Sequence, residues 1–197
     1  TTETNSYRRL SRFELTQGSN VAIRSSELVM IQQFVRSRIH SGGGMVIDKN
    51  GFLIIGLGDA GNCSEQYSTQ RLDKWLLGGI LRIDVDEKGG NISHPIRRLP
   101  VDYEDSATKF PDGCEDSYSQ GYYISNANPW QDRSGGTLEE FYALGIRHAY
   151  TLMYDAQKDE LWEGEIGQST WEEINKIKKG HNYEWPFLEA VKVHRSS

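Results

Sequence analysis

A histidine and an aspartate flank a short apolar stretch in the first third of the chain. His40 is followed by Gly42-Gly43-Gly44, and Asp59 comes 19 positions after the histidine. An imidazole titrates near neutral pH, and a carboxylate on its far nitrogen fixes the tautomer and stabilises the protonated ring. The pair has the groups of a general base and of a carboxylate that orients it. The alternative is that the glycines form an ordinary turn and that Asp59 caps the turn before Gly61.

These residues border one copy of a repeated unit. Met45 to Asp48, a polar turn and Leu53 to Gly58 resemble Leu152 to Asp155, a polar turn and Leu161 to Gly167. Alternating or wholly apolar runs of this length between turn-forming residues are typical of strands. Each unit is therefore expected to be an antiparallel hairpin, and Asn-Gly favours the turn of the first one.

Short strands are expected along most of the chain. The window Thr170 to Lys178 stays open, because the spacing of Trp171, Ile174 and Ile177 suits a helix, while Ile174 to Ile177 could equally be one short strand. The expected strands are Leu10–Leu15, Glu27–Phe34, Met45–Asp48, Phe52–Leu57, Ile80–Val85, Gly121–Ser125, Phe141–Leu144, Thr151–Tyr154 and Glu160–Glu165.

The spacing of the repeat predicts the architecture. Asp48 and Asp155 are 107 positions apart, about two to three times the roughly 40 to 50 residues of a propeller blade. The sequence therefore predicts an all-β fold, a β-propeller with four-stranded blades. About three blades fit into 197 residues, and three cannot close a ring. The chain is thus expected to be a segment of a longer polypeptide or to receive its other blades from elsewhere.

One partial propeller domain with a single core is expected over residues 1–197. Residues 87–120 are rich in Gly, Pro, Asp and Ser, and they indicate a surface excursion rather than a linker between two domains.

Composition excludes several classes of function. The chain has 22 Lys and Arg against 28 Asp and Glu, a net charge of −6, so it has no basic field for nucleic acid. No stretch approaches the roughly 18 apolar residues of a membrane span. Cys63 and Cys114 form no Cys-x-x-Cys or Cys/His cluster, which argues against a zinc site. One disulfide and two free thiols both remain open.

Several motifs from His40 to Pro186, taken together, resemble one known family, the soluble PQQ-dependent glucose/sorbosone dehydrogenases, which also include the hedgehog-interacting-protein type. The resemblance implies a six-bladed propeller and covers about the first half of one. It rests on His-x-Gly-Gly, Gly58-Asp59, Leu77-Gly78-Gly79-Ile80-Leu81-Arg82-Ile83-Asp84, Asn128-Pro129-Trp130, Gly145-Ile146-Arg147, Gly164-Glu165-Ile166-Gly167-Gln168, Trp171-Glu172-Glu173-Ile174-Asn175 and Gly180-His181-Asn182-Tyr183-Glu184-Trp185-Pro186.

The resemblance implies a quinoprotein oxidoreductase that uses PQQ and Ca²⁺ to oxidise a sugar hydroxyl or aldehyde. Electrons would pass to an external acceptor, in a periplasmic or secreted setting, with the remaining blades supplied by a longer chain. The roles it implies are a catalytic base and its orienter for His40 and Asp59, cofactor binding for Arg147 and His148, and main-chain calcium ligands for Gly167 and Gln168.

A propeller module for protein or carbohydrate binding is the alternative, because a scaffold can persist after its chemistry is lost. Three departures from the family pattern bear on this choice. Gly44 stands where many members of the family carry a bulkier residue. His148 stands where Asn is usual, and Glu184 stands in a tight turn where Gly is usual. Trp185 is expected to pack between blades.

Overall fold

The computed structural model describes residues 6–35, 39–61, 69–100 and 118–193, and its regular elements are strands apart from one single-turn 3₁₀ helix, η1 (Arg24–Ser26). Cys63 and Cys114 lie outside these ranges. No helix in the described ranges has the length and apolar character to cross a membrane. The strands are β1 (Ser6–Arg12), β2 (Leu28–Val35), β3 (Met45–Ile47), β4 (Leu53–Leu57), β5 (Gly79–Asp84), β6 (Ser93–Pro95), β7 (Tyr118–Ser119), β8 (Tyr123–Ser125), β9 (Phe141–Leu144), β10 (Ala149–Asp155), β11 (Glu160–Glu165), β12 (Glu173–Ile177), β13 (Leu188–Glu189) and β14 (Lys192–Val193).

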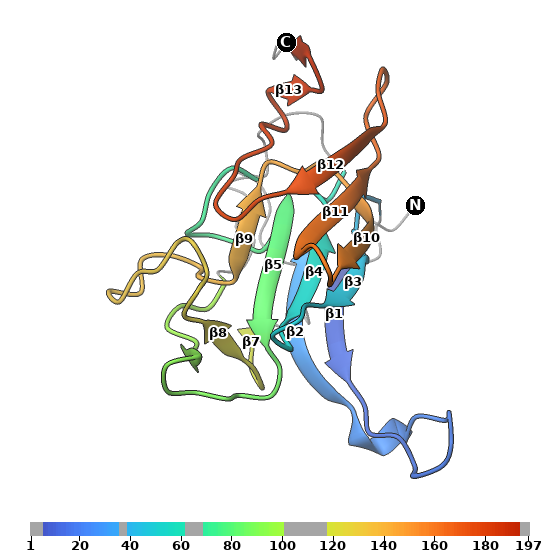
Figure 1. The fold of residues 1–197 in the computed structure, drawn as a ribbon, viewed down its shortest axis with the longest axis vertical. Coiled ribbons are helices and arrows are strands. Elements are labelled where there is room, and N and C mark those ends of the chain that lie inside the picture. The colour runs from blue at the N-terminus through green and yellow to red at the C-terminus, as the bar shows by residue number, and fades with distance from the viewer. Residues whose placement is uncertain (1–5, 36–38, 62–68, 101–117, 194–197) are drawn as a thin grey trace.

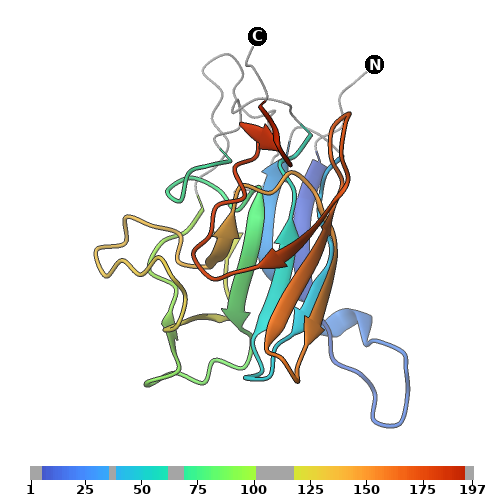
Figure 2. The same ribbon diagram turned by 45° about the horizontal axis from the view of Figure 1, so that its top comes forward.

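Three antiparallel sheets follow one another, as Figures 1 and 2 show from two sides. The first joins β1, β2 and β7. The second runs β3-β4-β5-β8-β6, with β9 also paired to β5. The third joins β10, β11 and β12, and β13 and β14 form a short separate hairpin. The all-β fold predicted from the sequence is therefore confirmed.

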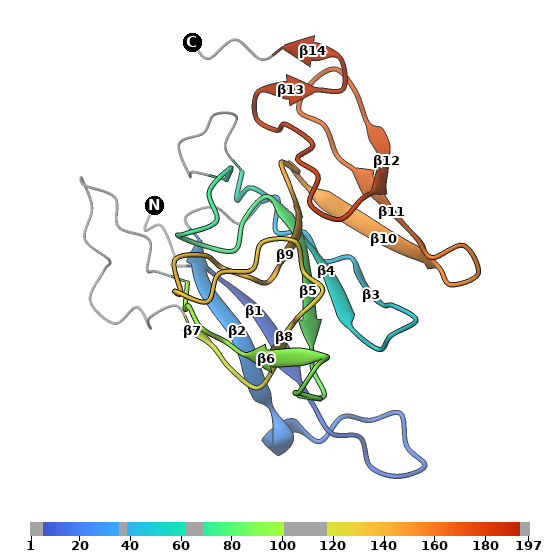
Figure 3. The same cartoon turned by 60° about the vertical axis from the view of Figure 1, so that its left-hand side comes forward.

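The repeated unit forms two corresponding hairpins. In β3–β4, Val46 pairs with Ile54, and in β10–β11, Met153 pairs with Trp162. Strand β10 contacts both β3 and β4, and Figure 3 shows the third sheet alongside the second. The two hairpins are thus neighbours in space although they are far apart in the chain.

The central sheet buries both of its faces. On one face Ile55 and Leu81 join Met30 and Ile31 of β2 in a core between the first and second sheets. On the other face the adjacent residues Ile54 and Ile80 join Ala149, Leu152 and Leu161 in a core between the second and third sheets. Successive residues of a strand point to opposite faces, so β4 and β5 serve both cores. All six residues of β5 are buried, which fits a blade packed between two others.

Two expected elements differ from the structure. The first strand is Ser6–Arg12 instead of Leu10–Leu15, because its arginines occupy strand positions and bond to polar partners, as Arg9 does to the buried Gln32 of β2. The open window near Thr170 contains a strand, β12, in which Ile174 is exposed and Ile177 is buried. That alternation is the strand pattern rather than the helical one.

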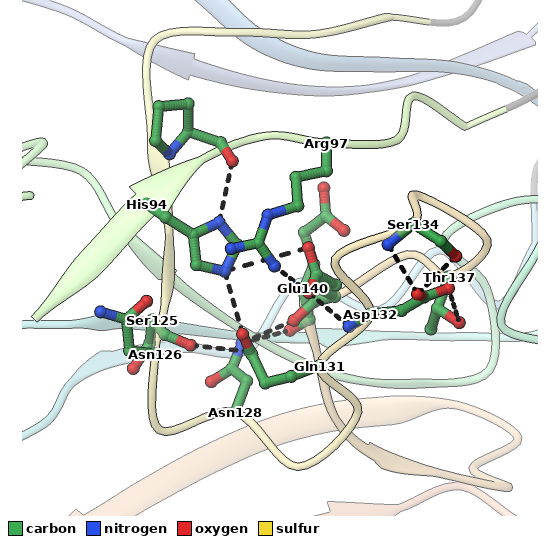
Figure 4. Close-up of polar contacts among 12 residues, drawn as sticks. His94, Arg97, Ser125, Asn126, Asn128, Gln131, Asp132, Ser134, Thr137 and Glu140 are labelled. Atoms are coloured by element: carbon green, nitrogen blue, oxygen red, sulfur yellow. Dashed lines mark hydrogen bonds and ion pairs between the residues drawn. The ribbon is translucent and has the colours of Figure 1, made fainter.

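The excursion expected over 87–120 contains β6 and, at its end, β7, and residues 101–117 lie outside the described residues. Its described part is fastened to the segment 126–139 by polar contacts (Figure 4). His94 Nε2 lies 3.0 Å from Gln131 Oε1, and Arg97 donates to Glu139 Oε1 at 2.9 Å. Asn128 Nδ2 donates to the backbone oxygen of Arg82, so the excursion is anchored to the central sheet.

Candidate active site

His40 and Asp59 meet at one end of the β3–β4 hairpin. The chain passes from His40 into β3, turns, and returns through β4 to Asp59. Pairing continues beyond β3, because Gly43 N donates to Gly56 O at 3.0 Å. Nδ1 of the imidazole lies 2.8 Å from Asp59 Oδ1, which is a hydrogen-bond distance. The contact is the one expected of two residues that flank a single antiparallel hairpin.

The contact leaves one ring nitrogen available. The Asp59 side chain is 1% exposed and that of His40 is 14% exposed. When Nδ1–H of a neutral imidazole donates a hydrogen bond to the carboxylate, the lone pair that can accept a proton is on Nε2. Within the described part of the chain, Nε2 has no hydrogen-bond partner. The pair therefore has the geometry of a general base whose tautomer is fixed from behind.

Arg8 of β1 holds the backbone on both sides of this pair. Its Nη1 donates to Gly58 O at 2.8 Å and its Nη2 to His40 O at 2.6 Å. Burial lowers the pKa of Arg8 to about 10, and the charge of Asp59 opposes that shift. His40 has a backbone φ of 51°, a left-handed conformation that costs free energy for a non-glycine residue. The bonds from Arg8 help to maintain it.

Asp59 is also bound from a distant part of the chain. Its Oδ2 accepts a hydrogen bond from Trp185 Nε1 at 2.9 Å, and its Oδ1 accepts one from Gly61 N at 2.7 Å. The expectation that Trp185 only packs between blades is therefore incomplete, because its indole N–H orients the carboxylate. Beside it, Glu184 has the left-handed φ of 71° that its turn position suggested.

Arg147 joins the second hairpin to the same end. Its backbone oxygen accepts a hydrogen bond from Asp59 N at 2.8 Å, and its Nη1 donates to Ile166 O at 2.9 Å. Its guanidinium lies 5.3 Å from the centre of the Trp185 ring. Among the described residues, neither Nε nor Nη2 has an acceptor. The side chain is thus positioned by protein contacts on one side and keeps donors for a ligand.

His148 lies next to the candidate base. Its ring centre is 5.2 Å from that of His40, and the two planes are 30° apart. Partial burial lowers the pKa of His148, and the nearby His40 and Arg147 lower it further. His148 is therefore neutral at pH 7, and its ring can accept as well as donate a hydrogen bond.

The loop with Gly167 and Gln168 follows β11 at this same end. Gly167 N donates to Glu172 Oε2 at 3.1 Å, and Gln168 N donates to Glu189 Oε1 at 2.6 Å. Burial would raise the pKa of Glu189, but backbone amides of residues 168–171 outweigh it and lower the pKa to about 2. Within the described chain, the backbone oxygens of Gly167 and Gln168 accept no hydrogen bond, so both are available as ligands.

A set of acidic side chains lies behind Arg147. Glu165 Oε1 accepts a hydrogen bond from Arg147 N, and Asn175 Nδ2 donates to Glu163 at 3.3 Å and to Glu165 at 3.1 Å. Burial raises the pKa of Glu163 well above its usual range, and the charge of Glu165 adds to this. Burial likewise raises the pKa of Glu165, with Glu173 adding to it. Burial therefore favours the protonated form of both Glu163 and Glu165.

The residues present suit the cofactors that the sequence suggested. No group of three or more His, Cys, Asp or Glu side chains in the described ranges could hold a metal ion, so a metal here depends on backbone oxygens. Calcium prefers such hard oxygen ligands. Gly167 has no room for a side chain, because a Cβ there would lie 1.6 Å from Trp171 O. The free donors of Arg147 suit the oxygens of a quinone.

Four contributors to this end were missed in the sequence: Arg8, Glu165, Trp185 as a donor, and Glu189. Arg8 and Trp185 lie 50 and 126 residues from the groups they bind. No local pattern connects such partners. Glu163 and Glu165 are two positions apart in an expected strand, so both side chains lie on the same face. That spacing is the signal in the sequence that could have indicated Glu165.

The fold and this site define a class of protein: a β-propeller segment with a His–Asp pair and a buried arginine at one end of its blades. The C-terminal part of the chain matches the glucose/sorbosone dehydrogenase family. Residues 119–195 match the family model described as Glucose / Sorbosone dehydrogenase.

Known relatives agree with this assignment. The HIPL1 protein of Arabidopsis thaliana is 30% identical over 153 residues, which is 77% of this chain and 19% of that protein. The aldose sugar dehydrogenase YliI of Escherichia coli (strain K12) is 28% identical over 147 residues, 75% of this chain and 29% of that protein. The chain therefore spans less than a third of these relatives.

Solved structures show the same fold. The PQQ-bound form of aldose sugar dehydrogenase from Streptomyces coelicolor matches with a TM-score of 0.59 at 22% identity, over 96% of this chain and 46% of that one. The apo-form of the soluble aldose sugar dehydrogenase from Escherichia coli matches with a TM-score of 0.53 at 21% identity, over 94% and 46%. The chain thus spans about half of such a propeller.

Proposed function

We propose that the full-length protein is a PQQ- and Ca²⁺-dependent sugar dehydrogenase that oxidises a hydroxyl or aldehyde carbon of an aldose or sorbosone-type sugar. The observation that carries the proposal is the partly buried contact of 2.8 Å between His40 Nδ1 and Asp59 Oδ1, which leaves Nε2 available to a substrate. The remaining blades are supplied by chain outside these 197 residues.

Oxidation of a sugar hydroxyl to a carbonyl removes a proton from oxygen and a hydride from carbon. Nε2 of His40 accepts the proton, and Asp59 stabilises the resulting imidazolium through the hydrogen bond at Nδ1. PQQ, when bound, supplies the acceptor for the two electrons, and Ca²⁺ polarises it.

Other residues of this chain hold the reactants in place. The unpaired guanidinium donors of Arg147 bind quinone oxygens, and the neutral ring of His148 lies beside them. The backbone oxygens of Gly167 and Gln168 bind the Ca²⁺. Electrons then pass to an external acceptor, and we place the protein in a periplasmic or secreted setting, where such an acceptor and free sugars are accessible.

Reconstitution of the full-length protein tests the proposal. Isothermal titration calorimetry with PQQ in the presence of Ca²⁺ should show binding, and aldoses should then reduce an artificial dye. A protein that binds no PQQ at micromolar concentration contradicts the proposal and favours a binding module for protein or carbohydrate.

A further inference from the structure

Glu189 lies behind the loop with Gly167 and Gln168 and binds four consecutive amides of that loop. Its Oε1 accepts hydrogen bonds from the backbone N–H of Gln168 at 2.6 Å, Ser169 at 3.1 Å, Thr170 at 3.3 Å and Trp171 at 3.4 Å. Glu189 is 2% exposed. One buried oxygen therefore fixes the orientation of four successive peptide groups.

Peptide geometry determines where the carbonyl groups of this loop point. A trans peptide is planar, so the C=O of one residue points opposite to the N–H of the next. The amide of Gln168 shares its peptide with the carbonyl of Gly167, and the amide of Ser169 shares its peptide with the carbonyl of Gln168. Because both amides point at Glu189, both carbonyl oxygens point away from it.

The same contacts strengthen these oxygens as ligands. A negative charge on the N–H side of a peptide polarises it and increases the partial charge on its oxygen. The backbone at Gly167 packs closely against this carboxylate, since a Cβ there would lie 2.6 Å from Glu189 Oε1. Ile166 O, one residue before Gly167, is bound to Arg147 Nη1 at 2.9 Å, so the loop is also tied to the candidate cofactor arginine.

We propose that Glu189 is a positioning residue for calcium, which fixes the backbone oxygens of Gly167 and Gln168 in a metal-binding orientation without contacting the metal. This inference rests on the proposed function, because the proposed function supplies the metal. Outer-sphere partners of this kind change metal affinity by roughly 10- to 100-fold.

The test is a titration of the PQQ-free full-length protein with CaCl₂, by calorimetry and by the rise in melting temperature that Ca²⁺ produces. Glu189→Gln keeps the shape and an acceptor oxygen but removes the charge. We expect its calcium dissociation constant to rise roughly 10- to 100-fold and its Ca²⁺-induced rise in melting temperature to shrink. The matched control is Glu160→Gln, which removes the charge of a half-buried glutamate on β11 whose partner is Lys176. The calcium affinity of this variant should stay unchanged.

Unchanged calcium affinity in Glu189→Gln, with or without a lower melting temperature, overturns the inference, because the role of Glu189 would then be structural only. A wild-type protein that binds PQQ and oxidises aldoses but gives no calcium heat also overturns it, while the proposed dehydrogenase reaction stands. If Glu189→Gln does not fold, Glu189→Asp keeps the charge but shortens the side chain by one methylene, which weakens its contacts with the four amides. Unaltered calcium affinity in that variant also overturns the inference.

Discussion

The β3–β4 and β10–β11 hairpins are alike at one end and different at the other. At their turns, Asp48 Oδ1 accepts the amides of Asn50 and Phe52, and Asp155 Oδ1 accepts those of Gln157 and Lys158. Each turn is thus closed by its own aspartate. At the opposite ends, the first hairpin presents an imidazole and a carboxylate, and the second presents an arginine and a loop of backbone oxygens.

This difference shows which parts of a blade can be specialised for function. The strands and turns satisfy their own hydrogen bonds locally, so they repeat with little change. The functional ends depend on partners outside the hairpins: Arg8 and Trp185 for the first hairpin and Glu189 for the second. One end is therefore suited to moving a proton and the other to holding a cofactor.

The largest expected effect is on the first hairpin. Asp59→Asn replaces the acceptor for His40 Nδ1–H with an amide that can donate to it, which favours the wrong tautomer. Turnover of the reconstituted full-length enzyme should fall by roughly 10²- to 10⁴-fold, as expected when a positioned base is lost. Asp155→Asn, the aspartate that closes the other hairpin, is the control and should turn over sugar normally. Equal activity of the two variants would remove the distinction between the hairpins.

A second effect concerns packing at the same two hairpins. In Gly58→Ala the new Cβ would lie 2.1 Å from His40 O, a backbone atom, so the substitution should destabilise the full-length protein by roughly 1 to 3 kcal/mol. In Gly164→Ala of β11 the Cβ meets only the Thr151 side chain, at 2.9 Å, and the cost should be smaller. Urea denaturation measures both, and a reversed order would show that the first hairpin is not the tighter one.

The sequence predicts contacts within one hairpin much better than contacts between sheets. His40 and Asp59 could be paired because a single hairpin returns the chain to its starting side. The contact of Asp59 with Trp185 could not, because the two residues are 126 positions apart and the chain between them forms the third sheet. The strand of Arg8 was placed too late in the chain, since charged residues hide a strand whose arginines are bound inside the fold.

Buried acids behind the second hairpin should make stability depend on pH. Burial raises the pKa of Glu163 in the native state. Its contribution to the free energy of unfolding is therefore fully present below the ordinary glutamate pKa and is lost as pH rises towards the native-state pKa. Glu163→Gln should match wild type near pH 5 and become relatively more stable at higher pH, by up to about 1.4 kcal/mol per pH unit. Melting curves at several pH values measure this, with Glu160→Gln as the control. A difference that does not change with pH would contradict burial as the cause.

The smallest effect is expected at the turns, where the two hairpins are alike. Lys49 and Asp159 form an ion pair at 2.7 Å between the turns, and their side chains are 48% and 54% exposed. Exposed pairs contribute little because solvent and salt screen them. Lys49→Ala should therefore leave the melting temperature and the turnover nearly unchanged, and a large loss of either would show that the turn ends are also specialised.

The most direct test of the account is the turnover of His40→Ala in the full-length protein, loaded with PQQ and Ca²⁺ and assayed by dye reduction with an aldose. His181→Ala, an exposed histidine outside the site, is the matched control. If His40 is the general base, its loss should lower turnover by roughly 10²- to 10⁴-fold while PQQ binding by calorimetry is retained. Undiminished turnover in His40→Ala would contradict the account.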